Sequence, residues 1–196
     1  MSERPAPEMD VGHVSSRLVH HGRIVRLSVD TVRFPDGSTG ELEMIRHPGA
    51  AAVLPVVGSL EEEDPQVVLL RQYRYASGGY LYEIPAGLPS GPDEPWDACA
   101  HRELEEETGY RAATLVPLTA IYTTPGFTDE VIRLYVATEL SKGESNLDDD
   151  EFVEVMTFPF SEVLEMVRRG DIVDCKSVST ILYAAQFVFG GASGDS

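Results

Sequence analysis

The stretch AGLPSGPDEPWDACAHRELEEETGY, residues 86–110, decides how the rest of the chain is interpreted. Pro95 suits the first position of a helix, because its missing N–H would have no helical partner there. Gly109 suits the left-handed position just past a helix end. The alanines and the leucine between them are good helix formers. The pattern therefore predicts a helix over residues 95–108, preceded by a loop rich in glycine and proline.

The predicted helix places three carboxylates together. Residues three and four apart lie on one helix face, so Glu103 and Glu107 stack one turn apart, with Glu106 beside them. Like charges at this spacing destabilise an isolated helix by about 0.2–0.5 kcal/mol per pair. A divalent cation reverses that sign, and carboxylate oxygens are ligands that Mg²⁺ binds together with water and phosphate. Arg102 can reach Glu106 at i+4. A glutamate-rich helix alone is more often a solvated face, so the neighbouring residues must decide.

Those neighbours resemble the signature of the Nudix hydrolase family. That signature is a glycine, a glutamate, seven residues, Arg-Glu, an aliphatic residue, any residue, Glu-Glu, any residue, glycine and an apolar residue. The residues that match in register are Glu94, Arg102, Glu103, Leu104, Glu106, Glu107, Gly109 and Tyr110. Gly87 lies seven residues before Glu94, where the family spacing is six. Either the loop holds one extra residue, or Asp93 fills the acidic position.

The resemblance implies an α+β class, with the Nudix fold as an α/β/α sandwich around a mixed sheet. It also implies cleavage of a nucleoside diphosphate linked to another moiety, with Mg²⁺, or alternatively Mn²⁺, as the cofactor. Such an ion neutralises and orients a diphosphate and lowers the pKa of a bound water. Carried over by position, the metal ligands are the carboxylates of Glu103, Glu106 and Glu107 and the carbonyl of Ala86. Arg102 and Glu106 are also expected to be catalytic.

Other segments resemble the ADP-ribose pyrophosphatases within this family. Pro125 follows Gly109 by sixteen residues in TTPGFTDE, residues 123–130, and the matching Glu130 is expected to contact the terminal ribose. We also expect Pro125 and Gly126 to line the substrate site, although an ordinary turn has the same composition. Arg74 in RQYRY resembles a phosphate-contacting position, and an arginine presents a fork of donors for that task. Strand-edge arginines without a function remain the alternative.

A water that attacks phosphorus needs a proton acceptor, which in ADP-ribose pyrophosphatases is a glutamate on a late loop. NLDDDEFVEV, residues 146–155, occupies the corresponding stretch. We expect Glu151 to be this base, with Asp150 and Asp149 as substitutes. The alternative is a solvated acidic loop.

The rest of the chain is predicted as strands followed by helices. Alternating residues around the turn PDGSTG predict strands near 16–20, 23–34 and 40–47. The family resemblance implies that this antiparallel N-terminal sheet packs across a two-fold dimer, from which Arg46 could reach a phosphate or the base. A serine cap at Ser161 predicts a late helix. The expected organisation is a flexible tail, 1–12; the N-terminal sheet, 13–48; the Nudix domain, 49–188; and a second flexible tail, 189–196.

Composition excludes several classes of partner. The net charge of −18 over 196 residues repels phosphate backbones and anionic lipid, so neither nucleic acid nor a membrane is expected to bind. Cys99 and Cys175 have no metal or disulfide spacing, which fits a reducing cytoplasm. No apolar run approaches the roughly 20 residues that span a bilayer, and the first residues lack the apolar core of a signal peptide.

The resulting hypothesis is Mg²⁺-dependent hydrolysis of ADP-ribose, or of related ADP-sugars, to AMP and ribose 5-phosphate by a cytoplasmic homodimer. One alternative is hydrolysis of another nucleoside diphosphate derivative, such as a different NDP-sugar or an NADH-like dinucleotide. Another is a nucleotide sensor that does not hydrolyse its ligand. The sequence leaves open the leaving moiety, the number of metal ions, the adenine-stacking residues and the pathway.

Overall fold

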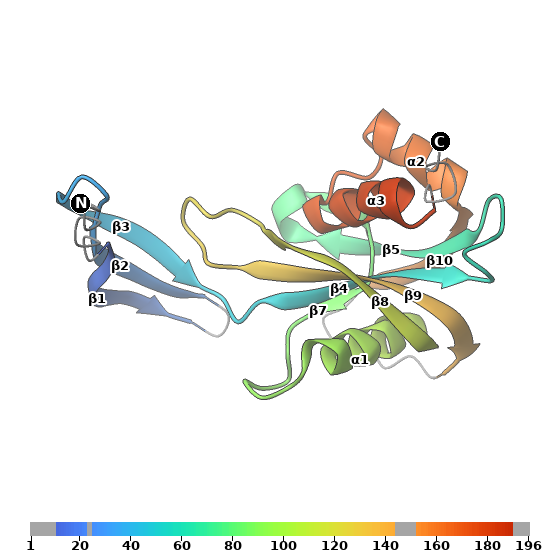
Figure 1. The fold of residues 1–196 in the computed structure, drawn as a ribbon, viewed down its shortest axis with the longest axis horizontal. Coiled ribbons are helices and arrows are strands. Elements are labelled where there is room, and N and C mark those ends of the chain that lie inside the picture. Colours follow the sequence, from blue (N-terminus) through green and yellow to red (C-terminus); the bar gives the residue numbers. More distant parts are fainter. Residues whose placement is uncertain (1–10, 23–24, 144–151, 190–196) are drawn as a thin grey trace, which may run out of the picture. The chain divides into compact units, whose positions relative to one another are not determined.

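The computed structural model describes residues 11–22, 25–143 and 152–189, and the chain divides into two units (Figure 1). The first unit comprises Met1–His47 together with Thr124–Glu130, and the second comprises Pro48–Thr123 and Val131–Ser196. The tails predicted at 1–12 and 189–196 lie almost wholly outside the described residues. Within the described residues, no helix has the length and apolar character needed to cross a membrane.

The first unit is a three-stranded antiparallel sheet in the order β1-β2-β3. Its strands are β1 Gly12–His21, β2 Arg26–Arg33 and β3 Thr39–Arg46. The turn between β2 and β3 contains Gly37 at φ 84°, a left-handed conformation that glycine adopts without steric cost. Asp36 accepts hydrogen bonds from the backbone and the hydroxyl of Ser38, which closes this turn.

The segment Thr124–Glu130 belongs to the first unit, although it connects two strands of the second. The amide of Ile45 donates to the carbonyl of Phe127 at 2.7 Å, and Ile45 and Thr128 form a parallel bridge. Backbone hydrogen bonds therefore join the end of β3 to the segment Thr124–Glu130, which contains the predicted substrate contacts.

The second unit is built on a seven-stranded mixed sheet in the order β10-β5-β4-β9-β8. β6 pairs with β5 and β7 with β4, and β4 runs parallel to β9. Its elements are β4 Ala50–Val57, β5 Gln66–Arg74, the short 3-10 helix Tyr75–Ser77, β6 Gly79–Glu83, β7 Ala86–Gly87, β8 Tyr110–Tyr122, β9 Val131–Lys142 and β10 Val153–Pro159.

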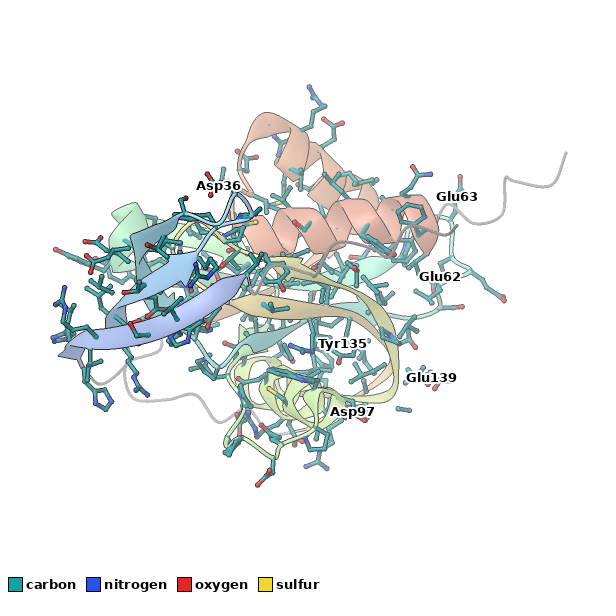
Figure 2. The ribbon with its side chains drawn as sticks, turned by 60° about the vertical axis from the view of Figure 1, so that its left-hand side comes forward. Asp36, Glu62, Glu63, Asp97, Tyr135 and Glu139 are labelled. Carbon is teal, nitrogen blue, oxygen red and sulfur yellow. The ribbon has the colours of Figure 1, made fainter. Side chains whose placement is uncertain are left out.

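Helices cover both faces of this sheet, so β4 is buried on both sides. Even-numbered residues such as Ala52 and Leu54 pack in the core with α2, Phe160–Arg169, and α3, Cys175–Phe187. Odd-numbered residues, Ala51 and Val53, pack in a second core with α1, Trp96–Thr108. Tyr135 of β9 belongs to this second core, near Asp97 of α1 (Figure 2). The mixed sheet between helices confirms the predicted α+β sandwich.

The observed helix ends agree with the predicted end signals for α1 but not for α2. α1 begins one residue after Pro95, and Gly109 ends it at φ 69°, as the sequence predicts. The expected serine cap of α2 is wrong. Ser161 lies inside the helix, and Asp64 from the loop after β4 accepts from both its amide, at 2.8 Å, and its hydroxyl, at 2.7 Å. A carboxylate 97 positions away therefore satisfies a free amide at the helix start.

Candidate functional site

One face of the glutamate-rich helix packs against the sheet, and its glutamates lie on other faces. Cys99, Ala100 and Leu104 of α1 are fully buried against β4 and β9. Burial raises the pKa of the Cys99 thiol to about 11, so this thiol stays neutral, and it donates to the carbonyl of Gly87 at 3.7 Å. A neutral buried thiol is a packing group and not a nucleophile.

Arg102 bonds three of the signature carboxylates. Its Nε and Nη2 donate to the two oxygens of Glu94 at 3.0 and 3.1 Å. Its Nη1 donates to Glu103 at 2.7 Å and to Glu106 at 2.8 Å. The hydrogen bonds from Arg102 lower the pKa of Glu94 to about 2, and the hydrogen bond to Glu94 is the largest cause that raises the pKa of Arg102. Both groups therefore stay charged at any physiological pH.

The pairing with Arg102 also decides between the two acidic residues of the loop. Glu94 makes the bidentate contact, whereas Asp93 is exposed. Glu94 also accepts from the amide of Ser90 at 2.7 Å, and Arg102 Nη2 donates to the carbonyl of Leu88 at 2.7 Å. The extra residue therefore lies in the loop between Gly87 and Glu94, and the helix register is the family register.

The backbone of β7 lies directly against the glutamates of α1. The amide of Ala86 donates to Glu107 at 2.8 Å, and the Glu107 side chain is buried. A Cβ on Gly87 would lie only 2.1–2.3 Å from the three carboxyl atoms of Glu103. Only glycine allows the loop and this carboxylate to approach so closely. The pairing of β7 with β4 fixes the loop, because Ala52 faces Ala86 and Ala51 faces Gly87.

The residues of this cluster fit a hard divalent cation by their chemistry. Its donors are oxygens only, from the carboxylates of Glu103, Glu106 and Glu107, and Mg²⁺ and Mn²⁺ prefer oxygen ligands. With Glu94 and Arg102 included, the cluster has three more negative than positive charges. In the described part of the chain, no three acidic, histidine or cysteine side chains form a ready ligand group for one ion. Arg102 pairs with two of the three carboxylates, Glu103 and Glu106.

Arg74, the expected phosphate contact, is held by a glutamate that sequence reasoning missed. Its Nε and Nη2 donate to the two oxygens of Glu83 at 2.8 and 2.9 Å. The hydrogen bond to Glu83 is the largest cause that raises the pKa of Arg74, and the charge of Glu107 adds to it. Arg74 therefore lies within electrostatic range of the glutamate cluster. A single charged residue in the apolar segment YLYEIP was the available signal for Glu83.

The remaining expected substrate residues lie in the first unit. Arg46 pairs with the buried Asp30 and, at 3.0 Å, with Asp129. His47 Nδ1 lies 3.2 Å from the carboxylate of Glu130. Pro125 and Gly126 are exposed. Arg46 therefore contacts the segment that contains these residues. The expected base Glu151, with Asp149 and Asp150, lies outside the described residues.

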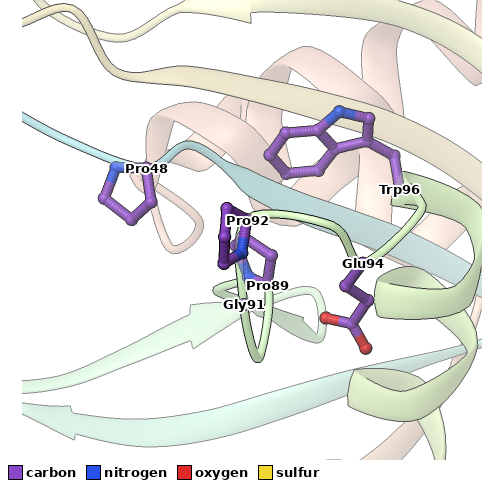
Figure 3. Close-up of a pocket in the computed structure, with 6 residues that line it drawn as sticks. All are labelled: Pro48, Pro89, Gly91, Pro92, Glu94 and Trp96. Carbon is purple, nitrogen blue, oxygen red and sulfur yellow. The ribbon is translucent and has the colours of Figure 1, made fainter.

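A pocket of about 460 Å³ borders the cluster on the side of Glu94 (Figure 3). It is lined by Pro48, Pro89, Gly91, Pro92, Glu94 and Trp96. The guanidinium of Arg133 lies over the Trp96 ring, 3.8 Å from its centroid, which is a cation–π contact. Apart from Glu94, the pocket wall is apolar or glycine.

The fold and this site define a class of protein: an α+β sandwich whose mixed sheet supports a glutamate-rich helix fixed by one arginine. Residues 47–174 match the family model described as the NUDIX domain. The chain therefore belongs to the Nudix family, and the identification made from residues 86–110 is confirmed.

Several known proteins are similar over most of the chain. An ADP-ribose pyrophosphatase of Bacillus subtilis (strain 168) is 38% identical over 172 residues, covering 87% of this chain and 90% of that protein. An ADP-ribose pyrophosphatase of Mycobacterium tuberculosis is 34% identical, covering 89% and 83%. A GDP-mannose pyrophosphatase of Cronobacter sakazakii is 38% identical, covering 69% and 76%. The crystal structure of an ADP compounds hydrolase matches with a TM-score of 0.79 at 20% identity, covering 95% and 98%, which shows a shared fold.

Proposed function

We propose that the protein hydrolyses the diphosphate bond of ADP-ribose to give AMP and ribose 5-phosphate, with Mg²⁺ as the cofactor. The observation that carries this proposal is the arrangement of Glu103, Glu106 and Glu107 against the β7 backbone, with Arg102 as their common partner. Support for the substrate comes from the two ADP-ribose pyrophosphatases that are 38% and 34% identical over most of the chain.

In this proposal the ion is held by the carboxylates of Glu103, Glu106 and Glu107 and by the carbonyl of Ala86. A carboxylate has two oxygens with about four lone-pair sites, so one that accepts from Arg102 can still bind a cation. Bound Mg²⁺ would neutralise the diphosphate and lower the pKa of a water molecule. Mn²⁺ offers the same preference for oxygen ligands.

The protein's own residues bind and orient the substrate. Arg74 uses Nε and Nη2 for Glu83, which leaves its Nη1 edge for a diphosphate oxygen. Arg102 pairs with Glu106 and Glu103 and so fixes part of the acidic face before the substrate arrives. The reaction breaks one P–O bond of the bridge, and the water oxygen bonds to the attacked phosphorus. Glu151 takes the proton of this water, with Asp150 and Asp149 as substitutes.

Further proposed substrate contacts come from Arg46 and from the segment Thr124–Glu130. Glu130 would accept from ribose hydroxyls, and Pro125 and Gly126 would line the site. Arg46, whose guanidinium contacts Asp30 and Asp129, would reach a phosphate or the base. We propose a cytoplasmic homodimer that pairs through the N-terminal sheet. The exposed apolar side chains of Val14, Leu18 and Val19 on the edge strand β1 support this interface.

The test is AMP release from ADP-ribose by the purified protein with Mg²⁺, followed by chromatography. Glu106→Gln and Glu107→Gln keep side-chain size and remove the charge, and we expect each to reduce kcat by at least about 100-fold. The matched control is Glu105→Gln on the same helix, because Glu105 bonds to Arg111 at 2.7 Å and is not part of the cluster. Full turnover by both cluster variants would remove this helix from the mechanism.

A different nucleoside diphosphate sugar is the second candidate substrate, favoured by the similarity to a GDP-mannose pyrophosphatase. A panel of ADP-ribose, GDP-mannose, other NDP-sugars and NADH, ranked by kcat/KM, distinguishes the two. A low rank for ADP-ribose would favour this second candidate. Tight ADP-ribose binding by calorimetry, without product in Mg²⁺ or Mn²⁺, would instead indicate a nucleotide sensor.

A further inference from the structure

Four charged side chains meet where β5, β6 and α3 come together in the second unit. Glu83, at the end of β6, is 2% exposed and accepts both Arg74 contacts and one from Lys176 Nζ. Lys176, in the first turn of α3, is 8% exposed and also contacts Asp174 at 3.0 Å. Charged groups are rarely buried unless they are paired. Each of the four side chains in this cluster is paired with an opposite charge.

The cluster joins the start of α3 to the loop that leads into the site. Asp174 caps α3 by accepting from the amide of Ser177 at 3.0 Å. The hydroxyl of Ser177, which is fully buried, accepts from the amide of Ile84 at 2.9 Å. Ile84 is two residues before Ala86. The first turn of α3 is therefore hydrogen-bonded to the backbone at Ile84, between Glu83 and β7.

The charges in this cluster determine how much of Arg74 is available to a ligand. An arginine in a bidentate pair with one carboxylate is neutralised, and attracts a further anion weakly. Here Glu83 has a second cation, Lys176, which also pairs with Asp174, so the four side chains together are neutral; without Lys176 they would have one net negative charge. The Nη1 of Arg74 has no hydrogen-bond partner among the described residues, and the Arg74 side chain is 43% exposed.

We infer that Lys176 is a positioning residue for Arg74: by sharing Glu83, it keeps this cluster neutral instead of negative and leaves the outer edge of Arg74 for the diphosphate. The inference rests on the proposed function, because it assigns to Lys176 an effect on substrate binding by that same site. Lys176 acts through Glu83 and Arg74 and does not itself need to touch the substrate.

The chain offers an unusually clean test, because Lys142 and Lys176 are its only lysines and Lys142 is exposed. Steady-state kinetics with ADP-ribose and Mg²⁺ are measured for Lys176→Met, Lys176→Arg and the control Lys142→Met. A charge-assisted contact corresponds to about a tenfold change in affinity or more, so Lys176→Met should raise KM at least about tenfold while kcat stays within about twofold. Lys176→Arg restores the charge and should restore KM, and Lys142→Met should not change it.

Two further variants separate this role from a purely structural one. Asp174→Asn keeps a good helix cap and removes one negative charge from the cluster, so KM should fall by about twofold or more. In an Arg74→Met background, adding Lys176→Met should change KM by less than about twofold, because Lys176 acts through Arg74. A loss of stability alone would not shift KM in opposite directions for Lys176→Met and Asp174→Asn.

The outcomes distinguish the inference from the function on which it rests. No turnover of ADP-ribose by the unsubstituted protein would overturn the proposed function. With turnover present, an unchanged KM in Lys176→Met would overturn the role of Lys176. The same would follow if Lys176→Met raised KM equally in the unsubstituted protein and in the Arg74→Met background. If Lys176→Met does not fold, which thermal unfolding reports, a KM in Asp174→Asn that is unchanged or raised overturns the inference, and a lowered KM supports it.

Discussion

Replacing Gly87 by alanine should abolish most of the activity without unfolding the protein. The added Cβ would lie 2.1 Å from the Glu103 carboxyl carbon, and ordinary van der Waals contact begins at 3.4 Å. The carboxylate must therefore retreat by more than 1 Å, which a flexible glutamate end can do at small cost in folding energy. A misplacement of about 1 Å in a catalytic site can reduce the rate about 100-fold.

The assay compares kcat/KM for ADP-ribose as Mg²⁺ is titrated, together with the midpoint of thermal unfolding. We expect Gly87→Ala to lose about 100-fold in kcat/KM and to need more Mg²⁺ for half-maximal rate. Its unfolding free energy should stay within about 1 kcal/mol of the unsubstituted protein, in the range of ordinary single substitutions. The control is Gly91→Ala in the same loop, because a Cβ there meets nothing within 4 Å.

Normal kinetics in Gly87→Ala would refute this reasoning, because they would show that the position of the Glu103 carboxylate is irrelevant to the reaction. Equal losses in Gly87→Ala and Gly91→Ala would refute it in a different way. They would assign the effect to loop stiffness, since only Gly87 approaches a carboxylate.

Three further predictions concern stability. Asp64→Ala removes the cap of α2 and should cost about 1 kcal/mol of unfolding free energy in urea, whereas the neighbouring Glu63→Ala should cost much less. Leu104→Ala leaves a cavity between α1 and the sheet and should cost about 2–5 kcal/mol in the same assay. The hydrogen bond from Ser16 is the largest cause that lowers the pKa of Asp30 below its ordinary 3.8. The ionised Asp30 carboxylate therefore stabilises the fold above pH 3.8, and this stabilisation is lost as pH falls through the lowered pKa. Asp30→Asn should make the unfolding free energy depend less on pH below 3.8. Acid titration followed by circular dichroism measures this difference.

Sequence reasoning predicted the features that local rules control. Pro95 and Gly109 placed α1 to within one residue, because a helix start and a left-handed helix end depend on neighbouring residues. Alternating apolar and polar residues placed the three strands of the first unit, although β1 is longer than expected and begins at Gly12. The i+4 spacing predicted that Arg102 reaches Glu106, and Arg102 Nη1 donates to Glu106 at 2.8 Å.

Contacts between distant segments were not predictable in this way. Asp64 and Ser161 are separated by 97 positions, and Glu83 and Lys176 by 93. No periodicity or turn rule connects residues so far apart, because the fold alone brings them together. The same limit explains Arg46, for which sequence reasoning offered only a ligand contact. The structure gives it two carboxylate partners, Asp30 and Asp129, and the second lies 83 positions away.

Arg102 and Arg74 have different electrostatic environments. Arg102 contacts three carboxylates and is outnumbered by them, so the acidic face remains net negative and attractive to a cation. Arg74 contacts one carboxylate, and because Lys176 shares that carboxylate, the group with Asp174 is neutral and does not repel an anion as it would without Lys176. A protein with a net charge of −18 repels a diphosphate at long range. An acidic group beside a neutral group whose arginine presents an outer edge would allow such a chain to bind a cation and an anionic substrate side by side.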